Sequence, residues 1–327
     1  MKKAIVLITI ITVLSFFSDT GFAQVPAPKA QAEEQVSFRL GVDFGSLTGS
    51  TLYNIKFPIN ETSNGITLLE GESELEFPLD SAIGGITASL GKKGHWSIDL
   101  SLSKNITEDT GKTTDIDILT AREDATGRIE RGWIIYSESD TDMDAFLFDL
   151  TGKFYIIKRT RISLGLAAGY RYQSFSFDIS NVSQEDAWDH YVYVPGKAAT
   201  YDITYSIPYA GLALDLRPSS RFSMNFSFAY GWAFAEDEDD HILRSKKSTA
   251  KSDGPYYSIK ADGNVSLSRR LSILLGLEYL RIETEGTQDQ IRYANTSEGP
   301  AGTIGTGIDY NAISDQLYIW LGMRYTF

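Results

Sequence analysis

The sequence predicts an all-β fold: a ten-stranded antiparallel transmembrane β-barrel with long extracellular loops and short periplasmic turns. Three observations predict it. Segments in which large apolar residues alternate with small or polar ones recur along the chain, and long and short connections alternate between them. After the N-terminal segment, no stretch approaches the run of about 18 apolar residues that a membrane-spanning helix needs.

The N-terminus has the pattern of a secretory signal peptide. Two lysines precede an apolar stretch over residues 4–17, and small residues follow at 21–23. Such a stretch is too short for a membrane span and is typical of a signal that is removed. We therefore assign residues 1–23 to the signal, 24–35 to a flexible arm without periodicity, and 36–327 to the barrel.

The segment 221–235 shows the strand pattern most clearly. Its even-numbered residues from Phe222 to Phe234 are large and apolar, and its odd-numbered residues are mostly small or polar. Side chains of a strand point alternately to its two faces, so one face is aromatic and the other hydrophilic. This is typical of a barrel strand between lipid and a wet interior. The same alternation is present in 95–107, 161–173, 271–279 and 318–327.

The connections between these segments fall into two classes that alternate along the chain. Short turns on one side and long loops on the other are characteristic of outer-membrane barrels. Five long and four short connections predict ten strands. The short ones are 91–94, 156–159, 217–220 and 266–270, and the long ones are roughly 50–72, 108–141, 179–200, 236–254 and 283–312.

Composition excludes several classes of function. The chain has no cysteine, which excludes a disulfide framework, a thiolate nucleophile and a cysteine-anchored lipid. Its net charge of −13 argues against nucleic acid as a partner. A mean hydropathy of −0.17 is too polar for a bundle of membrane helices, whereas barrel strands are half polar.

Two acidic clusters follow strands that run towards the predicted extracellular side. Asp237, Asp239 and His241 keep the odd numbering of the inward face of 221–235, so they are expected inside the barrel mouth. Asp115 and Asp117 have the inward parity of the strand 95–107, although Gly111 lies between. A histidine beside carboxylates suits a general base. The alternative is an acidic loop with an incidental histidine.

The chain resembles the omptins, ten-stranded outer-membrane endopeptidases of Gram-negative bacteria. Asp115-Ile116-Asp117 matches the Asp-x-Asp motif of that family, and Asp239-Asp240-His241 matches its Asp-x-His motif. Further similar stretches, in the same order, span nearly the whole mature chain; they include 45–49, 168–170, 208–212 and the terminal 324–327.

The resemblance implies a metal-independent peptidase in which water is the nucleophile. His241 would take its proton, Asp239 would orient the imidazole, and Asp115, supported by Asp117, would position the water. Peptides or proteins, especially cationic ones, would be the substrates. The resemblance implies no cofactor, apart from lipopolysaccharide as an activator. Phe327 ends the last strand with the signal read by the outer-membrane assembly machinery.

The chain departs from the family pattern in its substrate pocket. Asp237 matches one acidic residue that selects basic side chains, but the other, a glutamate, falls at Tyr53. The stretch around Ser137 and Ser139 lacks a family histidine, and we interpret these serines as loop or substrate-wall residues rather than nucleophiles. The lysines at 246, 247 and 251 would replace missing contacts to lipopolysaccharide.

Two readings without catalysis remain open. One is an inactive barrel that acts as an adhesin or binds a cationic ligand at its acidic mouth. The other is a small porin, which is disfavoured because side chains largely fill a ten-stranded barrel.

Overall fold

A computed structural model describes residues 36–296 and 299–327 of the chain. The signal peptide and arm assigned to 1–35 lie outside the described residues. No helix within the described ranges is long and apolar enough to cross a membrane. The elements are β1 (Val36–Ser63), β2 (Ile66–Pro78), β3 (Ser81–Lys92), β4 (Trp96–Asn105), β5 (Asp109–Glu123), β6 (Ile129–Lys158), β7 (Ile162–Asp186), β8 (Tyr191–Leu216), β9 (Phe222–His241), the 3₁₀ turn η1 (Ile242–Arg244), β10 (Lys246–Ser266), β11 (Leu271–Arg292) and β12 (Ile304–Thr326).

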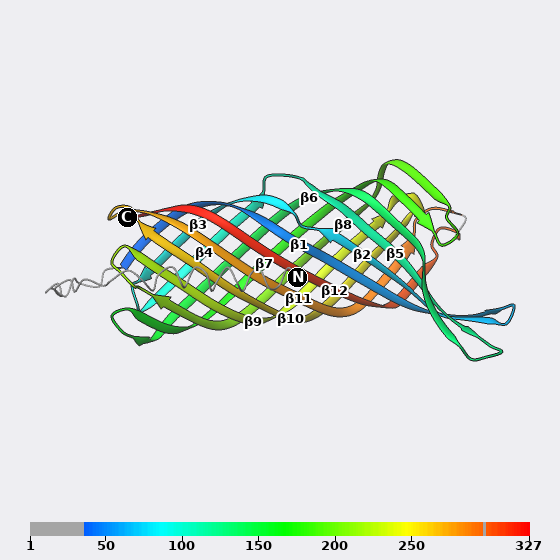
Figure 1. Cartoon of the computed structure of the whole chain (residues 1–327), viewed down its shortest axis with the longest axis horizontal. Helices are drawn as coiled ribbons and strands as arrows, with labels where there is room; N and C mark the ends of the chain where they lie inside the picture. Colours follow the sequence, from blue (N-terminus) through cyan, green and yellow to red (C-terminus); the bar gives the residue numbers. More distant parts are fainter. Residues whose placement is uncertain (1–35, 297–298) are drawn as a thin grey trace. The chain divides into compact units, whose positions relative to one another are not determined.

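All twelve strands belong to one antiparallel sheet that closes on itself (Figure 1). β12 pairs with β1, and the closed ring β1-β3-β4-β6-β7-β8-β9-β10-β11-β12 passes through ten strands. The all-β antiparallel barrel predicted from the sequence is therefore confirmed. The chain nevertheless forms twelve strands instead of ten, because two of the expected strands are interrupted.

The interruptions divide β2 from β3 and β4 from β5. β1 pairs with β3 up to Leu47 and with β2 from Ser50 onward, so the two shorter strands lie end to end along the same side of β1. Between β4 and β5, the Asn105 side chain takes the place of the ladder. Its amide donates to the Met143 carbonyl at 2.6 Å and accepts from the Ala145 N–H at 2.8 Å.

The long connections are mostly strand, which corrects the expectation of long extracellular loops. β1 and β2 are joined through Asn64 and Gly65, and β7 and β8 through residues 187–190. Polar and charged residues in these segments are typical of loops. The segments are nevertheless paired strands, which continue the sheet beyond the membrane. The β1–β2 and β5–β6 hairpins project beyond the rest of the sheet at the end opposite the C-terminus (Figure 1).

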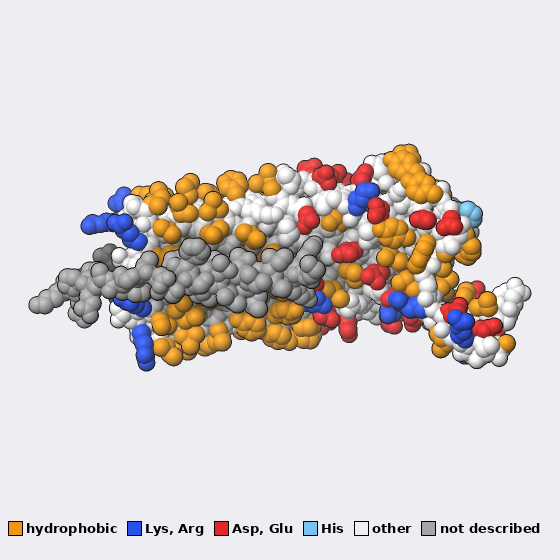
Figure 2. All heavy atoms as spheres, in the orientation of Figure 1, with side chains coloured by type: hydrophobic (Ala, Val, Ile, Leu, Met, Phe, Trp, Pro, Cys, Tyr) orange, Lys and Arg blue, Asp and Glu red, His pale blue; other side chains and the backbone are white. Residues whose placement is uncertain are grey.

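An apolar belt covers the outside of the barrel at the end where the C-terminus lies (Figure 2). Alternate residues of β9, from Phe228 to Phe234, are exposed on this surface, as are Phe38 to Phe44 on β1. Acidic side chains gather over the other half of the visible face. β9 therefore leaves the apolar belt after Phe234, and the residues that follow it lie outside the membrane.

Inside the barrel, large aromatic side chains pack beside the strand segments that leave the belt. Tyr53 and Phe77 contact Tyr201, with ring centroids 5.2 and 4.4 Å apart, and Tyr53 also packs against Tyr310. We call Tyr53, Phe77, Phe177, Tyr201 and Tyr310 the aromatic cluster. All five side chains are at most 3% exposed, so they hold the backbone around them rigidly.

Candidate active site

β9 carries three of the predicted site residues into the barrel interior. Asp237 and Asp239 are 8% and 2% exposed, whereas the intervening even-numbered side chains are more exposed. The parity predicted from 221–235 therefore continues to the end of the strand. β9 remains paired with β8 and with β10 as far as His241, so both neighbours fix its course beyond the belt.

Asp239 and His241 form a hydrogen-bonded pair. The Asp239 Oδ2 atom lies 2.9 Å from Nε2 of His241 and also accepts a 2.5 Å hydrogen bond from the Tyr53 hydroxyl. Burial alone would raise the pKa of Asp239, but the adjacent His241 and the Tyr53 hydroxyl lower it below its ordinary value. The pair is therefore an anchored carboxylate that orients an imidazole through one ring nitrogen.

β5 carries Asp115 and Asp117 to the opposite wall. Gly111 has φ +108°, and here the register between β5 and β6 shifts by one residue. Before the bulge an even-numbered residue, Thr110, is buried inside the barrel, and after it an odd-numbered one, Thr113, is buried. The bulge therefore places the odd-numbered residues, which include both aspartates, on the inward face. The uncertainty that Gly111 introduced into the sequence argument is thereby resolved.

The two walls face each other across a cleft of about 190 Å³. Asp117 lines it together with Asp239 and His241. Burial and then the neighbouring Asp117 raise the pKa of Asp115 to about 6, while the nearby His241 and Arg244 oppose this rise. Both acidic pairs and the histidine thus share one electrostatic environment. The cleft is lined by Tyr53, Ile55, Phe57, Gly71, Glu72, Ser73, Asp117, Ile118, Leu119, Ile134, Asp239, His241, Arg244, Lys246 and Gln290.

Asp237 lies in a different environment from the one expected for a substrate pocket. Its Oδ2 atom accepts hydrogen bonds from the hydroxyls of Tyr310 and Tyr201, and its Oδ1 atom accepts one from the Ala250 N–H at 3.1 Å. Burial raises its pKa to about 7, because these bonds only partly offset the loss of water. Asp237 does not belong to the cleft-lining residues within the described ranges.

Other predicted site residues differ in place from expectation. Ser137 and Ser139 are buried on β6, not in a loop, and Ser137 is the register partner of Asp115. Lys246 lines the cleft, whereas Lys247 does not and pairs with Glu238 at 2.6 Å. Of the three lysines expected to contact lipopolysaccharide, Lys246 lines the cleft, while Lys247 and Lys251 pair with glutamates of β9.

Tyrosine hydroxyls hold the buried carboxylates Asp237 and Asp239, and these contacts were not predicted from the sequence. Tyr53 was expected to line a substrate pocket; it does line the cleft, but it also holds Asp239. Tyr201 and Tyr310 were not predicted at all. Their signal was available, since a buried carboxylate needs donors and inward-facing tyrosines supply them.

The donor set does not resemble a catalytic zinc site. Within the two described ranges, no group of three or more His, Cys, Asp or Glu side chains is arranged to hold a metal ion. His190 is in an exposed turn and contacts Asp186 at 2.9 Å, far along the chain from the cleft residues. One imidazole among carboxylates is a set suited to proton transfer.

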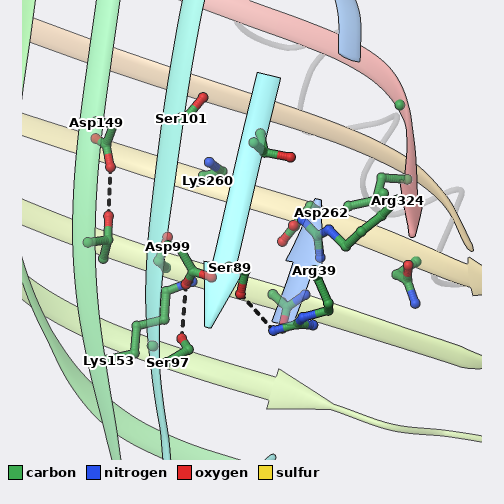
Figure 3. A pocket seen from close by; sticks show the side chains of 18 of the residues that line it. Arg39, Ser89, Ser97, Asp99, Ser101, Asp149, Lys153, Lys260, Asp262 and Arg324 are labelled. Atoms are coloured by element: carbon green, nitrogen blue, oxygen red, sulfur yellow. Dashed lines mark hydrogen bonds and ion pairs between the residues drawn. The ribbon is translucent and has the colours of Figure 1, made fainter. Parts of the chain in front are cut away.

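A second cavity of about 470 Å³ lies within the belt (Figure 3). Its charges form ion pairs between neighbouring strands and, from Arg171 on β7 to Glu278 on β11, between strands that are not neighbours. Lys153 contacts Asp99 at 3.2 Å, and Arg171 contacts Asp149 at 2.9 Å and Glu278 at 2.6 Å. We interpret these pairs as part of the polar filling of the barrel, because each charge in them has an opposite partner.

The chain matches a known protein family. The model described as the Omptin family matches residues 86–327. This chain belongs to the omptin family. Among similar omptins, Protease 7 of Escherichia coli O157:H7 is 27% identical over 55% of this chain and 59% of its own length. The plasminogen activator of Yersinia pestis is 23% identical over the full length of both chains.

The fold is also that of a solved omptin structure. The crystal structure of outer membrane protease OmpT from Escherichia coli superposes with a TM-score of 0.66, at 18% identity, over 89% of this chain and 97% of that one. The chain spans about 59% of the length of the Protease 7 sequences that it matches, and 58% of outer membrane protease OmpP of Escherichia coli K12. The likeness to OmpT supports the barrel fold.

Proposed function

We propose that this omptin is an outer-membrane endopeptidase that hydrolyses peptide bonds with an activated water molecule at the extracellular mouth of the barrel. The observation that carries the proposal is that Asp117 lines one cleft together with the Asp239–His241 pair, while Asp115 is electrostatically coupled to Asp117, His241 and Asp239. Asp115 and Asp117 come from β5, and the Asp239–His241 pair comes from β9. Its relatives include Protease 7 and the outer membrane protease OmpP, and this likeness supports the same reaction class.

His241 is the proposed general base. Its Nε2 atom is held by Asp239, so Nδ1 is the nitrogen that accepts the proton of the attacking water. The water oxygen bonds to the peptide carbonyl carbon as that proton moves to His241. The same proton then passes to the amine nitrogen as the C–N bond breaks. Asp239 remains ionised throughout and stabilises the imidazolium.

Asp115 and Asp117 are the proposed water-holding pair. With its pKa raised to about 6, Asp115 shares a proton with Asp117 over a range below neutral pH. A carboxyl pair with one proton can accept from water and donate to the developing oxyanion. These steps use only side chains of this chain, and we propose that no metal takes part.

Several partners belong to the same proposal. Substrates are peptides or proteins that reach the barrel mouth from outside the cell. Lipopolysaccharide is a proposed activator, with Lys247 and Lys251 as outer-surface cations; each is paired with a glutamate of β9. Phe327, packed against Phe38 at the end of β12, is the proposed signal for barrel assembly. A preference for basic residues would depend on Asp237, whose oxygens already accept three hydrogen bonds. The proposed function therefore does not extend to this preference.

The experiment is peptide cleavage by the refolded barrel, with and without lipopolysaccharide. Wild type is expected to cut, and His241→Ala and Asp115→Asn are each expected to lose at least about a thousandfold in kcat/KM. Ser139→Ala is the matched control, since it removes a hydroxyl from the neighbouring strand, and it should keep its activity. Heat-modifiable migration checks that each variant is folded. Retained cleavage by His241→Ala would refute the mechanism.

A further inference from the structure

The cavity within the belt carries an excess of positive charge. Among the described residues, ten lysines and arginines line it against six aspartates and glutamates, whereas the whole chain has a net charge of −13. The lining includes the turns between β3 and β4, β8 and β9, and β10 and β11, which lie at the end of the barrel that holds the C-terminus. Lys and Arg side chains are prominent at that end in Figure 2, and no acidic side chain is visible there. The excess therefore belongs to the predicted periplasmic opening of the barrel.

Most carboxylates of this cavity already have a partner. Four of them contact Lys153, Arg171 or Arg217 in ion pairs: Asp99, Asp149, Asp215 and Glu278. Asp43 accepts a hydrogen bond from the Tyr318 hydroxyl at 2.9 Å. Within the described ranges, Asp262 is the remaining carboxylate of the lining and has neither kind of contact. The cations of the cavity outnumber the carboxylates that are left to balance them.

Two arginines lie side by side near the opening, without an acidic partner. Arg39 lies opposite Thr326 in the ladder between β1 and β12, and Arg324 is two residues from Thr326, so the two arginines are diagonal neighbours on the inward face. Neither forms an ion pair with a residue in the described part of the chain. Arg39 donates from Nη2 to the Ser89 hydroxyl at 2.9 Å (Figure 3), but its Nε atom is buried and has no hydrogen-bond partner. An anion between the two guanidinium groups would offset their repulsion and supply the missing acceptor.

Lys93 brings a third cation to this position from the exposed turn between β3 and β4. Partial loss of hydration, and then the neighbouring Arg217 and Arg39, lower the pKa of Lys93 below its ordinary value. Asp215 opposes this change, and it is also the carboxylate that holds Arg217, at 3.2 Å. The Nη1 atom of Arg217 reaches the same turn, since a Cβ atom placed on Gly94 would lie 3.8 Å from it. Like charges from three separate parts of the chain therefore meet at the opening.

We propose that the periplasmic opening of this cavity is a binding site for a phosphate group, held by Arg39, Lys93 and Arg324. A guanidinium presents parallel N–H donors that match the oxygens of a phosphate, and an ammonium adds a compact positive charge. The phosphate can belong to a free ion or to the headgroup of an anionic phospholipid in the inner leaflet, and the experiment separates these two sources. The site lies at the opposite end of the barrel from the cleft, so it does not depend on the proposed peptidase function.

The test is the thermal midpoint of the refolded barrel in an uncharged detergent, with inorganic phosphate replacing chloride at constant ionic strength. Wild type should be stabilised in a saturable way, because a ligand that binds only the folded state raises its stability. Lys93→Gln and Arg39→Gln should each need at least about tenfold more phosphate for half of the effect, as the loss of a charge-assisted hydrogen bond requires. Arg161→Gln is the matched control, because Arg161 is an exposed cation of the β6–β7 turn at the same end and does not line the cavity. It should keep the phosphate dependence of wild type.

A second arm replaces the free ion with phosphatidylglycerol mixed into the detergent, against phosphatidylcholine. Saturable stabilisation that Lys93→Gln weakens and Arg161→Gln does not supports the site, and the arm in which it occurs names the source of the phosphate. If Arg39→Gln does not fold, Lys93→Gln still decides, because its side chain lies in an exposed turn. Stabilisation in neither arm, a rise without saturation, or an equal response of Lys93→Gln and Arg161→Gln would each overturn the proposal.

Discussion

Tyr53→Phe tests whether the Tyr53 hydroxyl holds the Asp239–His241 pair in its active state. The substitution removes one oxygen and keeps the ring that packs against Phe77, Tyr201 and Tyr310 at centroid distances of 6.0, 5.2 and 5.8 Å. The lost contact is the 2.5 Å hydrogen bond to Asp239 Oδ2. Asp239 is 2% exposed, so water cannot readily replace it.

The magnitude follows from the chemistry of that bond. A hydrogen bond to a charged group contributes about 1.5–3 kcal/mol. At 1.36 kcal/mol for each factor of ten, losing it favours protonated Asp239 by a factor of about 10 to 100. Tyr53 is one of the causes that lower the pKa of Asp239, so its removal raises that pKa. The acidic limb of kcat/KM should therefore move to higher pH.

The assay is kcat/KM for one peptide from pH 4 to 9. Tyr310→Phe is the matched control, because it removes a hydroxyl from the same aromatic cluster but from Asp237. Its acidic limb should stay where wild type has it. An unmoved limb in Tyr53→Phe, or an equal movement in both variants, would refute the assignment of Tyr53 as the residue that positions Asp239.

Three further predictions concern stability and assembly. The pKa of Asp237 is about 7 in the folded protein, above the unfolded value of about 3.9, so the folded protein binds this proton more tightly. The stability that the protonated Asp237 contributes is therefore lost as pH rises from 4 through 7. The thermal midpoint of heat-modifiable migration should fall over this range, and it should fall less in Asp237→Asn. Arg171→Met leaves Asp149 and Glu278 without their buried cation and should cost about 3–5 kcal/mol, measured by urea unfolding in detergent. Gly49→Ala should impair refolding yield, because its Cβ would lie 2.0 Å from the Asp315 carbonyl oxygen at the β1–β12 seam.

The strand parity was the most predictive part of the sequence. In β9 every residue from Phe222 to His241 continues one ladder without a bulge, so numbering alone placed Asp237, Asp239 and His241 on the inward face. Local periodicity succeeds here because nothing interrupts the strand. In β5 the odd-numbered aspartates face inward only because the bulge at Gly111 shifts the alternation by one residue. Periodicity alone could not reveal that shift.

Predictions that depended on contacts between distant strands were less successful. The expected long loops are largely strand, because polar residues above a membrane pair as well as apolar ones do. Tyr53 lines the cleft, and its role in binding substrate stays a prediction; the sequence did not show that its hydroxyl also donates to Asp239, which lies 186 residues further along the chain. The tyrosine partners of Asp237 come from β8 and β12, and no local pattern joins these segments.

The most direct test of the account is a double-mutant cycle across the cleft. It compares kcat/KM for wild type, Asp115→Asn, His241→Ala and the double variant, all in the folded, heat-modifiable form. If the two walls activate one water molecule, each single variant loses nearly all activity, and the double variant is no worse than the weaker single one. Losses that multiply, or substantial activity in either single variant, would contradict a shared site between β5 and β9.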